Sequence, residues 1–225
     1  MLRLPKGVPL FEKLDATNLQ LDAVVLKLKH GCFTGYAAIV FAQANSILVF
    51  ESGKLISAVF ENNAGVRCSS FEALNALAEQ MAARDTSILN VYRLSGDLTL
   101  CIHALLQGEV RYRGQALGLI DIKTLLERIK GEQMNCCLRI YTDDQSSMIF
   151  YKGGEPLGFF HDGSEEIEAS PGNSQQLTQN PNAKLDLYST TGIDELMAQD
   201  LLEMFHIDSI WKSAVCKQQA KTAGS

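Results

Sequence analysis

The chain has 225 residues, a hydrophobic content of 46% and a formal net charge of −6, which suit one large or two ordinary globular domains. The acidic total argues against nucleic-acid binding as the main function, because such proteins gather Lys and Arg to neutralise phosphates. Prolines and charges interrupt the N-terminal stretch MLRLPKGVPLFEK, so we predict no export signal and a cytoplasmic location.

The first predicted element is a helix that begins after Asn18 and ends at Gly31. Leu21, Val24, Val25 and Leu28 recur at the spacing of one helical face. This pattern predicts an amphipathic helix with its apolar stripe toward a core.

The next stretch, GYAAIVFAQANSILVFESGKLISAVFE at 35–61, is the most apolar part of the chain. Polar residues interrupt it twice, whereas a membrane span needs about 20 apolar residues in succession. Its Gly53-Lys54 pair lacks the earlier glycine and the following hydroxyl residue of a phosphate loop. We therefore predict three strands, near 36–42, 46–51 and 54–61, with Gly53 supplying a positive φ in the second turn.

Three further elements follow. Leu74, Leu77, Ala78 and Met81 predict a second amphipathic helix that begins near Ser69. The stretch SILNVYRLS predicts a strand over 88–94, and the apolar stripe within 98–105 predicts a third helix closed by Gly108. These elements fill about 90 residues, enough for one domain with its own core.

The same order of elements returns in the second half of the chain. The stretch from Cys136 onward matches 35–61 at a constant offset of 100, which pairs Phe50 with Phe150 and Gly53 with Gly153. LNVYRLS at 89 matches LDLYSTT at 185 at an offset of 96. Recurrence of helix, hairpin and late strand in one order indicates a tandem duplication.

The predicted fold class is therefore α+β, with two tandem repeats of an antiparallel β-meander and covering helices, in the order helix, three strands, helix, strand, helix. The predicted domains are residues 10–113 and 114–213. In the second repeat, 163–184 is polar and reads as a surface loop where the first repeat has a helix. Residues 214–225 read as a flexible tail.

Several short motifs of the first repeat resemble the PATAN-type domain, the PatA N-terminal-like module of prokaryotic signalling proteins. They are Thr34-Gly35, Phe50, Gly53-Lys54, Ile56 and Ala58. The second repeat keeps only Phe150, Gly153 and Gly158 in step, and the strand at 88–94 departs from the usual domain. The resemblance implies tandem copies of an interaction module in signalling or motility systems, with no active site to carry over.

The residue types that carry chemistry show no catalytic pattern. The four histidines are far apart, and the adjacent acids Asp143-Asp144 fit a hairpin turn. The six cysteines contain no C-x-x-C pair, and Cys136 and Cys137 would point to opposite faces of a strand. We predict free thiols, no metal, no cofactor and no enzymatic activity.

Two stretches are candidates for binding. Arg111-Tyr112-Arg113 combines two guanidinium groups with an aromatic ring, which suits contact with an anion or, less well given the acidic total, with nucleic acid. The segment 193–211 reads as a last helix with more apolar positions than one stripe needs, so Phe205, Ile210 and Trp211 are candidates for an interface.

The excess apolar surface of this helix would cover either the other repeat or an external partner. We therefore predict a non-enzymatic protein-interaction or adaptor module with a protein partner or a homo-oligomeric state. Two alternatives remain open: a sensor that binds a small ligand between the two repeats, and an unrecognised enzyme.

Overall fold

The computed structural model describes residues 4–161, 167–168, 177–190 and 200–223. The chain forms two compact units. Unit 1 contains residues 8–99 and 194–225, and unit 2 contains residues 2–7 and 100–193.

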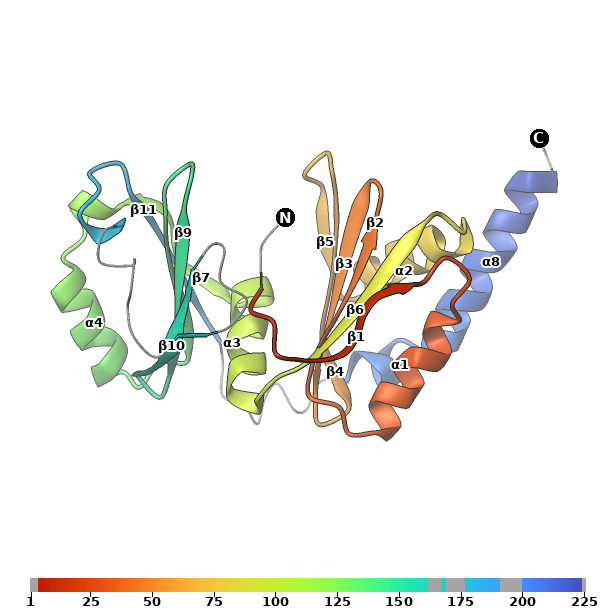
Figure 1. The fold of residues 1–225 in the computed structure, drawn as a ribbon, viewed down its shortest axis with the longest axis horizontal. Helices are drawn as coiled ribbons and strands as arrows, with labels where there is room; N and C mark the ends of the chain where they lie inside the picture. The colour runs from red at the N-terminus through yellow and green to blue at the C-terminus, as the bar shows by residue number, and fades with distance from the viewer. Residues whose placement is uncertain (1–3, 162–166, 169–176, 191–199, 224–225) are drawn as a thin grey trace. The chain divides into compact units, whose positions relative to one another are not determined.

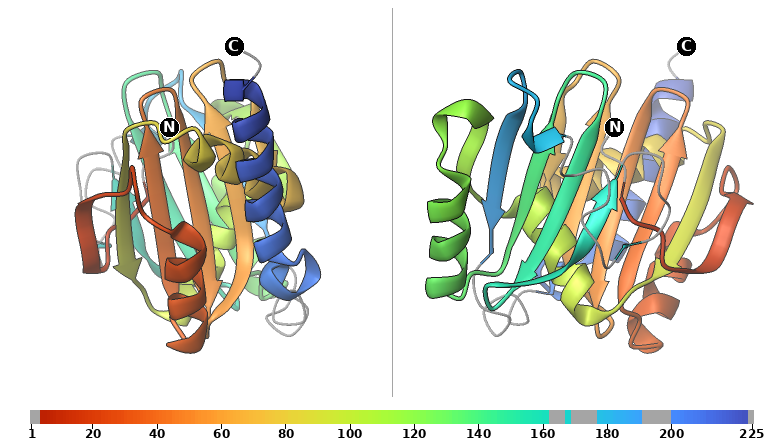
Figure 2. Two further views of the ribbon diagram at one scale, coloured as in Figure 1. Left: turned by 90° about the vertical axis from the view of Figure 1, so that its right-hand side faces the viewer. Right: turned by 60° about the vertical axis from the view of Figure 1, so that its left-hand side comes forward.

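Unit 1 has a six-stranded antiparallel sheet in the order β1-β6-β2-β3-β4-β5. Its strands are β1 (Val8–Asp15), β2 (Gly35–Phe41), β3 (Ala44–Glu51), β4 (Lys54–Asn62), β5 (Arg67–Ser69) and β6 (Ser87–Arg93). Helices α1 (Leu21–His30), α2 (Ser70–Ala82) and α8 (Ile207–Ala223) lie on one face of this sheet (Figures 1 and 2).

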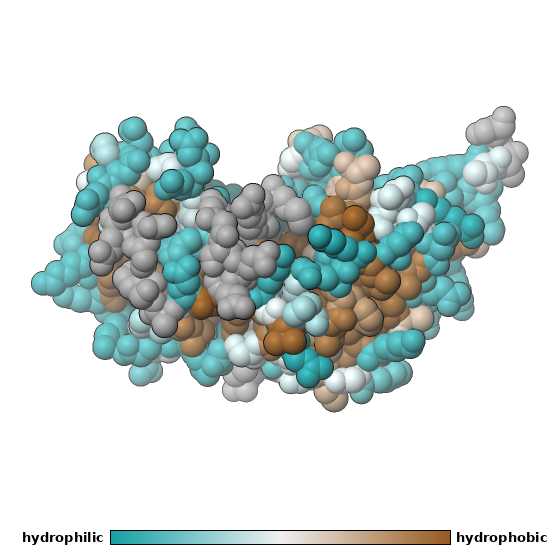
Figure 3. Space-filling model, in the orientation of Figure 1, coloured by the Kyte–Doolittle hydropathy of each residue, from teal (hydrophilic) through white to brown (hydrophobic). Residues whose placement is uncertain are grey.

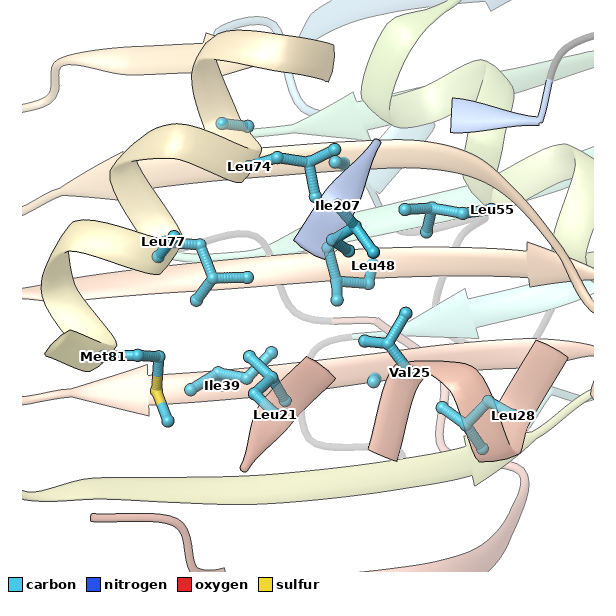
Figure 4. Close-up of a cluster of buried hydrophobic side chains, with 14 of the residues drawn as sticks. Leu21, Val25, Leu28, Ile39, Leu48, Leu55, Leu74, Leu77, Met81 and Ile207 are labelled. Carbon is cyan, nitrogen blue, oxygen red and sulfur yellow. The ribbon is translucent and has the colours of Figure 1, made fainter. Parts of the chain in front are cut away.

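The core of unit 1 lies between this sheet face and the helices. The predicted stripes are the buried ones: Leu21, Val25 and Leu28 of α1 pack on alternate strand residues such as Ile39 and Leu48 (Figure 4). α2 adds Leu74 and Leu77, both fully buried. At about 25 cal/mol per Å² of buried apolar surface, this contact is the main stabilising term of the unit.

Unit 2 has a five-stranded antiparallel sheet in the order β10-β9-β8-β11-β7. Its strands are β7 (Glu109–Ala116), β8 (Cys136–Tyr141), β9 (Ser146–Lys152), β10 (Glu155–His161) and β11 (Lys184–Ser189). Helix α4 (Ile122–Gly131) covers one face through Leu125 and Ile129. From the other side, Cys101 of α3 (Gly96–Gln107) donates its thiol to the Tyr151 carbonyl at 3.8 Å.

The two sheets have the same topology, which confirms the α+β class and fits the tandem repeat. β1, β6, β2, β3 and β4 stand in the same order as β7, β11, β8, β9 and β10. Each copy therefore begins with an outer strand that the sequence patterns did not predict. We call the segment from β1 to α3 the first copy and the segment from β7 onward the second copy.

The strand registers show that the copies align at an offset of 101, not 100, through the meander. Gly35 lies opposite Phe50, and Cys136 and Tyr151, each 101 positions later, lie opposite one another. Phe50 and Tyr151 both belong to the core under the first helix of their copy, whereas Phe150 points to the opposite face of its sheet. The predicted match of Phe50 with Phe150 is therefore wrong, because a shift of one residue reverses the face of every side chain.

Turn hydrogen bonds repeat at the same offset. The Gly53 N–H donates to the Phe33 carbonyl at 2.8 Å, and the Gly154 N–H donates to the Met134 carbonyl at 2.9 Å. Gly154, rather than Gly153, is thus the counterpart of Gly53. The late strand keeps the predicted offset of 96, since Gly35 also pairs with Arg93 and Cys136 with Ser189.

The boundary between the domains differs from the predicted 113/114. β7 pairs with β11, so 109–113 belongs to unit 2, and the C-terminal residues from 200 onward pack in the core of unit 1. The chain enters unit 2 within α3, between Thr99 and Leu100. Most of the predicted loop at 163–184 lies outside the described residues.

The predicted last helix, at 193–211, also needs correction. Its first part lies outside the described residues, and the rest is two helices, the short α7 (Leu201–Met204) and α8, separated by His206 at a φ of 44°. α8 continues to Ala223, so most of the segment predicted as a flexible tail is helical.

We predict that Gly53→Ala lowers the free energy of unfolding by about 2–5 kcal/mol. Gly53 has a φ of +83°, and a Cβ there would lie 2.4 Å from the Lys29 carbonyl oxygen. Left-handed backbone costs about 1–2 kcal/mol in a residue with a Cβ, and overpacking adds about 1–3 kcal/mol. Urea denaturation of the full chain measures the loss.

Gly153→Ser is the matched control, because Ser52 occupies the corresponding position of the first copy at a φ of 51°. A Cβ at Gly153 meets nothing within 4 Å, so this variant should lose only the backbone cost of about 1–2 kcal/mol, without the cost of overpacking. Equal losses for the two variants would contradict the alignment at 101.

Candidate interaction surfaces

The C-terminal helices are attached to unit 1 by a buried carboxylate. Asp200 Oδ1 accepts hydrogen bonds from the backbone N–H of Leu202 at 3.0 Å and of Leu55 at 3.2 Å. Its Oδ2 lies 3.2 Å from Lys29 Nζ, which also contacts the exposed Glu203 at 3.0 Å. Asp200 therefore caps α7 and fixes it to both β4 and α1.

The structure separates the three residues predicted for an interface. Ile210 is 5% exposed and lies in the core of unit 1, so a partner cannot contact it. Phe205 packs against the same core and contacts the ring of Phe71, with 5.1 Å between ring centroids. Trp211 is half-buried and lines a groove. Much of the apolar excess of this segment thus covers its own unit.

The groove beside Trp211 has a volume of about 820 Å³. It runs between the C-terminal end of α2, the segment before α1 and the outer half of α8. Its walls combine apolar side chains such as Met81 and Leu19 with the charged Arg84 and Lys212. The mixed lining favours no single class of ligand.

The outer strand of unit 1 carries a second exposed apolar surface, which we call the β1 surface. It consists of Val8, Leu10, Phe11 and Leu14 on β1, which are 66%, 39%, 46% and 37% exposed. Figure 3 shows apolar surface over the region where β1 and β6 lie in Figure 1. Single exposed apolar residues are normal in proteins, but a contiguous group marks a contact surface.

The second copy shows that the fold does not require apolar residues on this strand. At an offset of 101, the positions of the β1 residues are occupied by residues with polar groups. The pairs are Val8 with Glu109, Leu10 with Arg111, Phe11 with Tyr112, and Leu14 with Gln115. Since both strands pair in the same register with an equivalent neighbour, the strand pairing itself does not require apolar residues in β1.

The predicted anion-binding stretch on β7 is divided between two sides of its strand. Arg111 and Tyr112 line a cavity of about 230 Å³, and Arg128 of α4 completes its polar rim. Arg113 instead lies near the buried Asp186, where burial and that carboxylate raise the pKa of Tyr188, and the charges of Arg113 and Arg139 oppose the rise. Arg128 was missed because only tertiary structure places this helix residue beside the strand.

Side chains that could carry other chemistry are dispersed. Among the described residues, no three His, Cys, Asp or Glu side chains are grouped closely enough to hold a metal ion. Cys136 lies in the core under α4, while Cys137 points to the opposite face, as predicted. Burial raises the pKa of Cys136 to about 12 and raises that of Cys137, so neither thiol is an activated nucleophile.

No helix in the described part of the chain is both long enough and apolar enough to cross a membrane.

Comparison with known proteins gives a match over the first copy alone. Residues 2–106 match the model of a family described as an uncharacterized protein conserved in archaea (DUF2226). Searches of curated proteins and of solved structures each found no match. The family match carries no activity, and the resemblance to PATAN-type domains stays a prediction.

We predict that Asp200→Ala lowers the free energy of unfolding by about 2–4 kcal/mol. The substitution removes a helix cap, worth about 1 kcal/mol, and leaves the buried Leu55 N–H without its acceptor, which costs about 1–3 kcal/mol. Glu203→Ala is the control, because its exposed ion pair with Lys29 contributes at most about 1 kcal/mol. Chemical denaturation distinguishes the two, and similar losses would show that Asp200 is not the anchor.

Proposed function

We propose that this protein is a non-enzymatic interaction module that binds a protein partner through the β1 surface of unit 1. The observation that carries the proposal is the contrast between the copies: four exposed positions are apolar on β1 and polar on β7. The two copies can therefore be compared directly: β1 and β7 occupy the same place in the same fold, but their exposed residues differ.

The geometry favours side-chain contact over addition of a strand. Pro9 has no N–H to donate, and pairing with β6 is irregular on both sides of Phe11. Lys13 has a φ of 54°, and its N–H already donates to the Asn90 side chain at 2.9 Å. Proline, lysine and bulges are the usual means of blunting a sheet edge.

Two of the apolar side chains continue the core outward. Phe11 lies opposite Val91 and Leu14 lies opposite Leu89, and both partners belong to the core under the helices. Phe11 and Leu14 therefore emerge on the side of the sheet that carries α1. Aromatic residues such as Phe11 are enriched in protein interfaces relative to the rest of the surface.

A setting in prokaryotic signalling or motility is part of the proposal and rests on the resemblance to PATAN-type domains. A cytoplasmic location is a further part, supported by the free state of all six cysteines.

The test is a variant that carries the second copy's residues: Val8→Glu, Leu10→Arg, Phe11→Tyr and Leu14→Gln. Because β7 accepts these residues at the same register, the variant should fold with a stability within about 1 kcal/mol of the parent. We expect it to lose association, measured as the concentration dependence of molar mass in sedimentation and as crosslinking from a photoreactive phenylalanine at position 11.

The control is the same photoreactive group at Leu119, which is 85% exposed on unit 2. A single defined product, either a second copy or another protein, that forms from position 11 but not from 119 supports the proposal. A parent that stays monomeric and crosslinks no more from position 11 than from 119 would refute it.

A further inference from the structure

We propose that unit 2 holds a separate binding site for a small organic anion, in the cavity between β7, β11 and α4. The site is independent of the β1 surface and belongs to the second copy alone. The ligand class is a carboxylate or phosphate head on a compact apolar body.

The floor of the cavity is apolar and mostly buried. It is formed by Leu125 of α4, Leu187 of β11 and Met134, of which Leu125 and Leu187 are 5% and 2% exposed. A volume of about 230 Å³ exceeds the roughly 150 Å³ of a dry cavity that accepts benzene. The floor therefore suits a ring or a short branched chain.

The rim carries two guanidinium groups in fixed orientations. Arg111 donates its Nε–H to Ser189 Oγ at 3.1 Å and its Nη2 contacts Glu109 Oε2 at 2.9 Å. Arg128 donates its Nε–H to Glu132 Oε1 at 2.7 Å, and it lines the same cavity as Tyr112. These bonds use only part of the five N–H donors of each guanidinium, so donors remain for an oxyanion.

The two acids on the rim orient the guanidinium groups without closing the site. The side chains of Glu109 and Glu132 are 65% and 50% exposed, and ion pairs at such exposure contribute about 0–1 kcal/mol. The Arg111 and Arg128 side chains are 46% and 55% exposed, so an anion above the apolar floor would be held by donors from both guanidinium groups at once. Charge-assisted hydrogen bonds of this kind are about twice as strong as neutral ones.

The first copy again supplies the contrast. At the offset of 101, the cavity residues Arg111, Tyr112, Arg128 and Met134 correspond to Leu10, Phe11, Lys27 and Phe33. Phe33 is a larger side chain that is 3% exposed in the core of unit 1, and it packs edge-on against Phe50. At these positions the second copy thus has a cavity where the first copy has a filled core, and it carries two guanidinium groups at the mouth of that cavity.

Two variants of the full chain test the site separately. Met134→Phe should fill the cavity as Phe33 does, while it keeps both guanidinium groups. Arg111→Leu removes one guanidinium and takes the residue found on β1. Arg113→Leu is the control, because it makes the same change of charge on the other side of the strand.

The probes are benzoate, phenyl phosphate, inorganic phosphate and benzyl alcohol, each titrated by calorimetry. We expect saturable binding of benzoate or phenyl phosphate to the parent, with the tighter of the two identifying the head group. Met134→Phe and Arg111→Leu should each weaken it by about tenfold or more, and Arg113→Leu should leave it within about twofold.

The proposal is overturned if inorganic phosphate binds as tightly as phenyl phosphate, or benzyl alcohol as tightly as benzoate, because one half of the site would then have no role. It is also overturned if Met134→Phe, folded by its melting transition, binds the probes as the parent does, or if no probe binds. Loss of probe binding together with intact association through β1 shows that the two sites are independent.

Discussion

The structure depends on one close contact in each copy, where the second hairpin of the meander meets the end of the first helix. Gly53 approaches the last turn of α1 so closely that a Cβ would collide with the Lys29 carbonyl, and Gly154 approaches Lys130 of α4 in the same way. The hydrogen bonds from these glycines to the residues after the helix hold the contact together. It sets the position of the helix on the sheet, and the irregular step in strand pairing after each hairpin recurs at the same place in both copies.

Where the copies differ, the differences compensate one another. Leu55 of β4 presents an N–H that Asp200 accepts, and the corresponding residue of the second copy is Pro156, which has no N–H to satisfy. The same holds for the outer strands: the N–H of Lys13 bonds to Asn90, and that of Gly114 bonds to Asp186 at 2.7 Å. At this position the backbone N–H donates to a side chain of the neighbouring strand in both copies, but the accepting residue differs.

Because the two copies keep the same strand pairing, the exposed positions at which they differ point to differences in function. A residue that differs between the copies at an equivalent, exposed position is not dictated by the strand pairing, which is the same in both. The apolar β1 surface and the guanidinium-rimmed cavity in unit 2 both lie on or beside the outer strand. The first copy uses that strand for apolar surface, and the second uses it for charge.

The sequence by itself determined the elements and their recurrence. The stripe of α1, the three strands of the meander, the glycine turn with positive φ and the offset of 96 for the late strand all follow from short-range periodicity. The exact offset of the meander did not, because β3 and β9 are apolar on both faces and lack the alternation that fixes register. The outer strands were missed for a related reason, since β1 and β7 are exposed and irregular and show no buried face.

Only the tertiary structure decided what the candidate residues do. The sequence predicted the same interface role for Phe205, Ile210 and Trp211 because all three are apolar. Ile210 is buried because α8 packs against residues 8–99 of unit 1, which are far away in sequence. The group around Arg111 was recognised from its neighbours in sequence. However, the irregular pairing of β7 with β11 leaves Arg111 and Tyr112 on one side and Arg113 on the other, and α4 brings Arg128 in its place. Periodicity along a chain reports which face of an element is apolar, whereas a site is made by faces of different elements. Their meeting is fixed by packing between residues far apart in sequence.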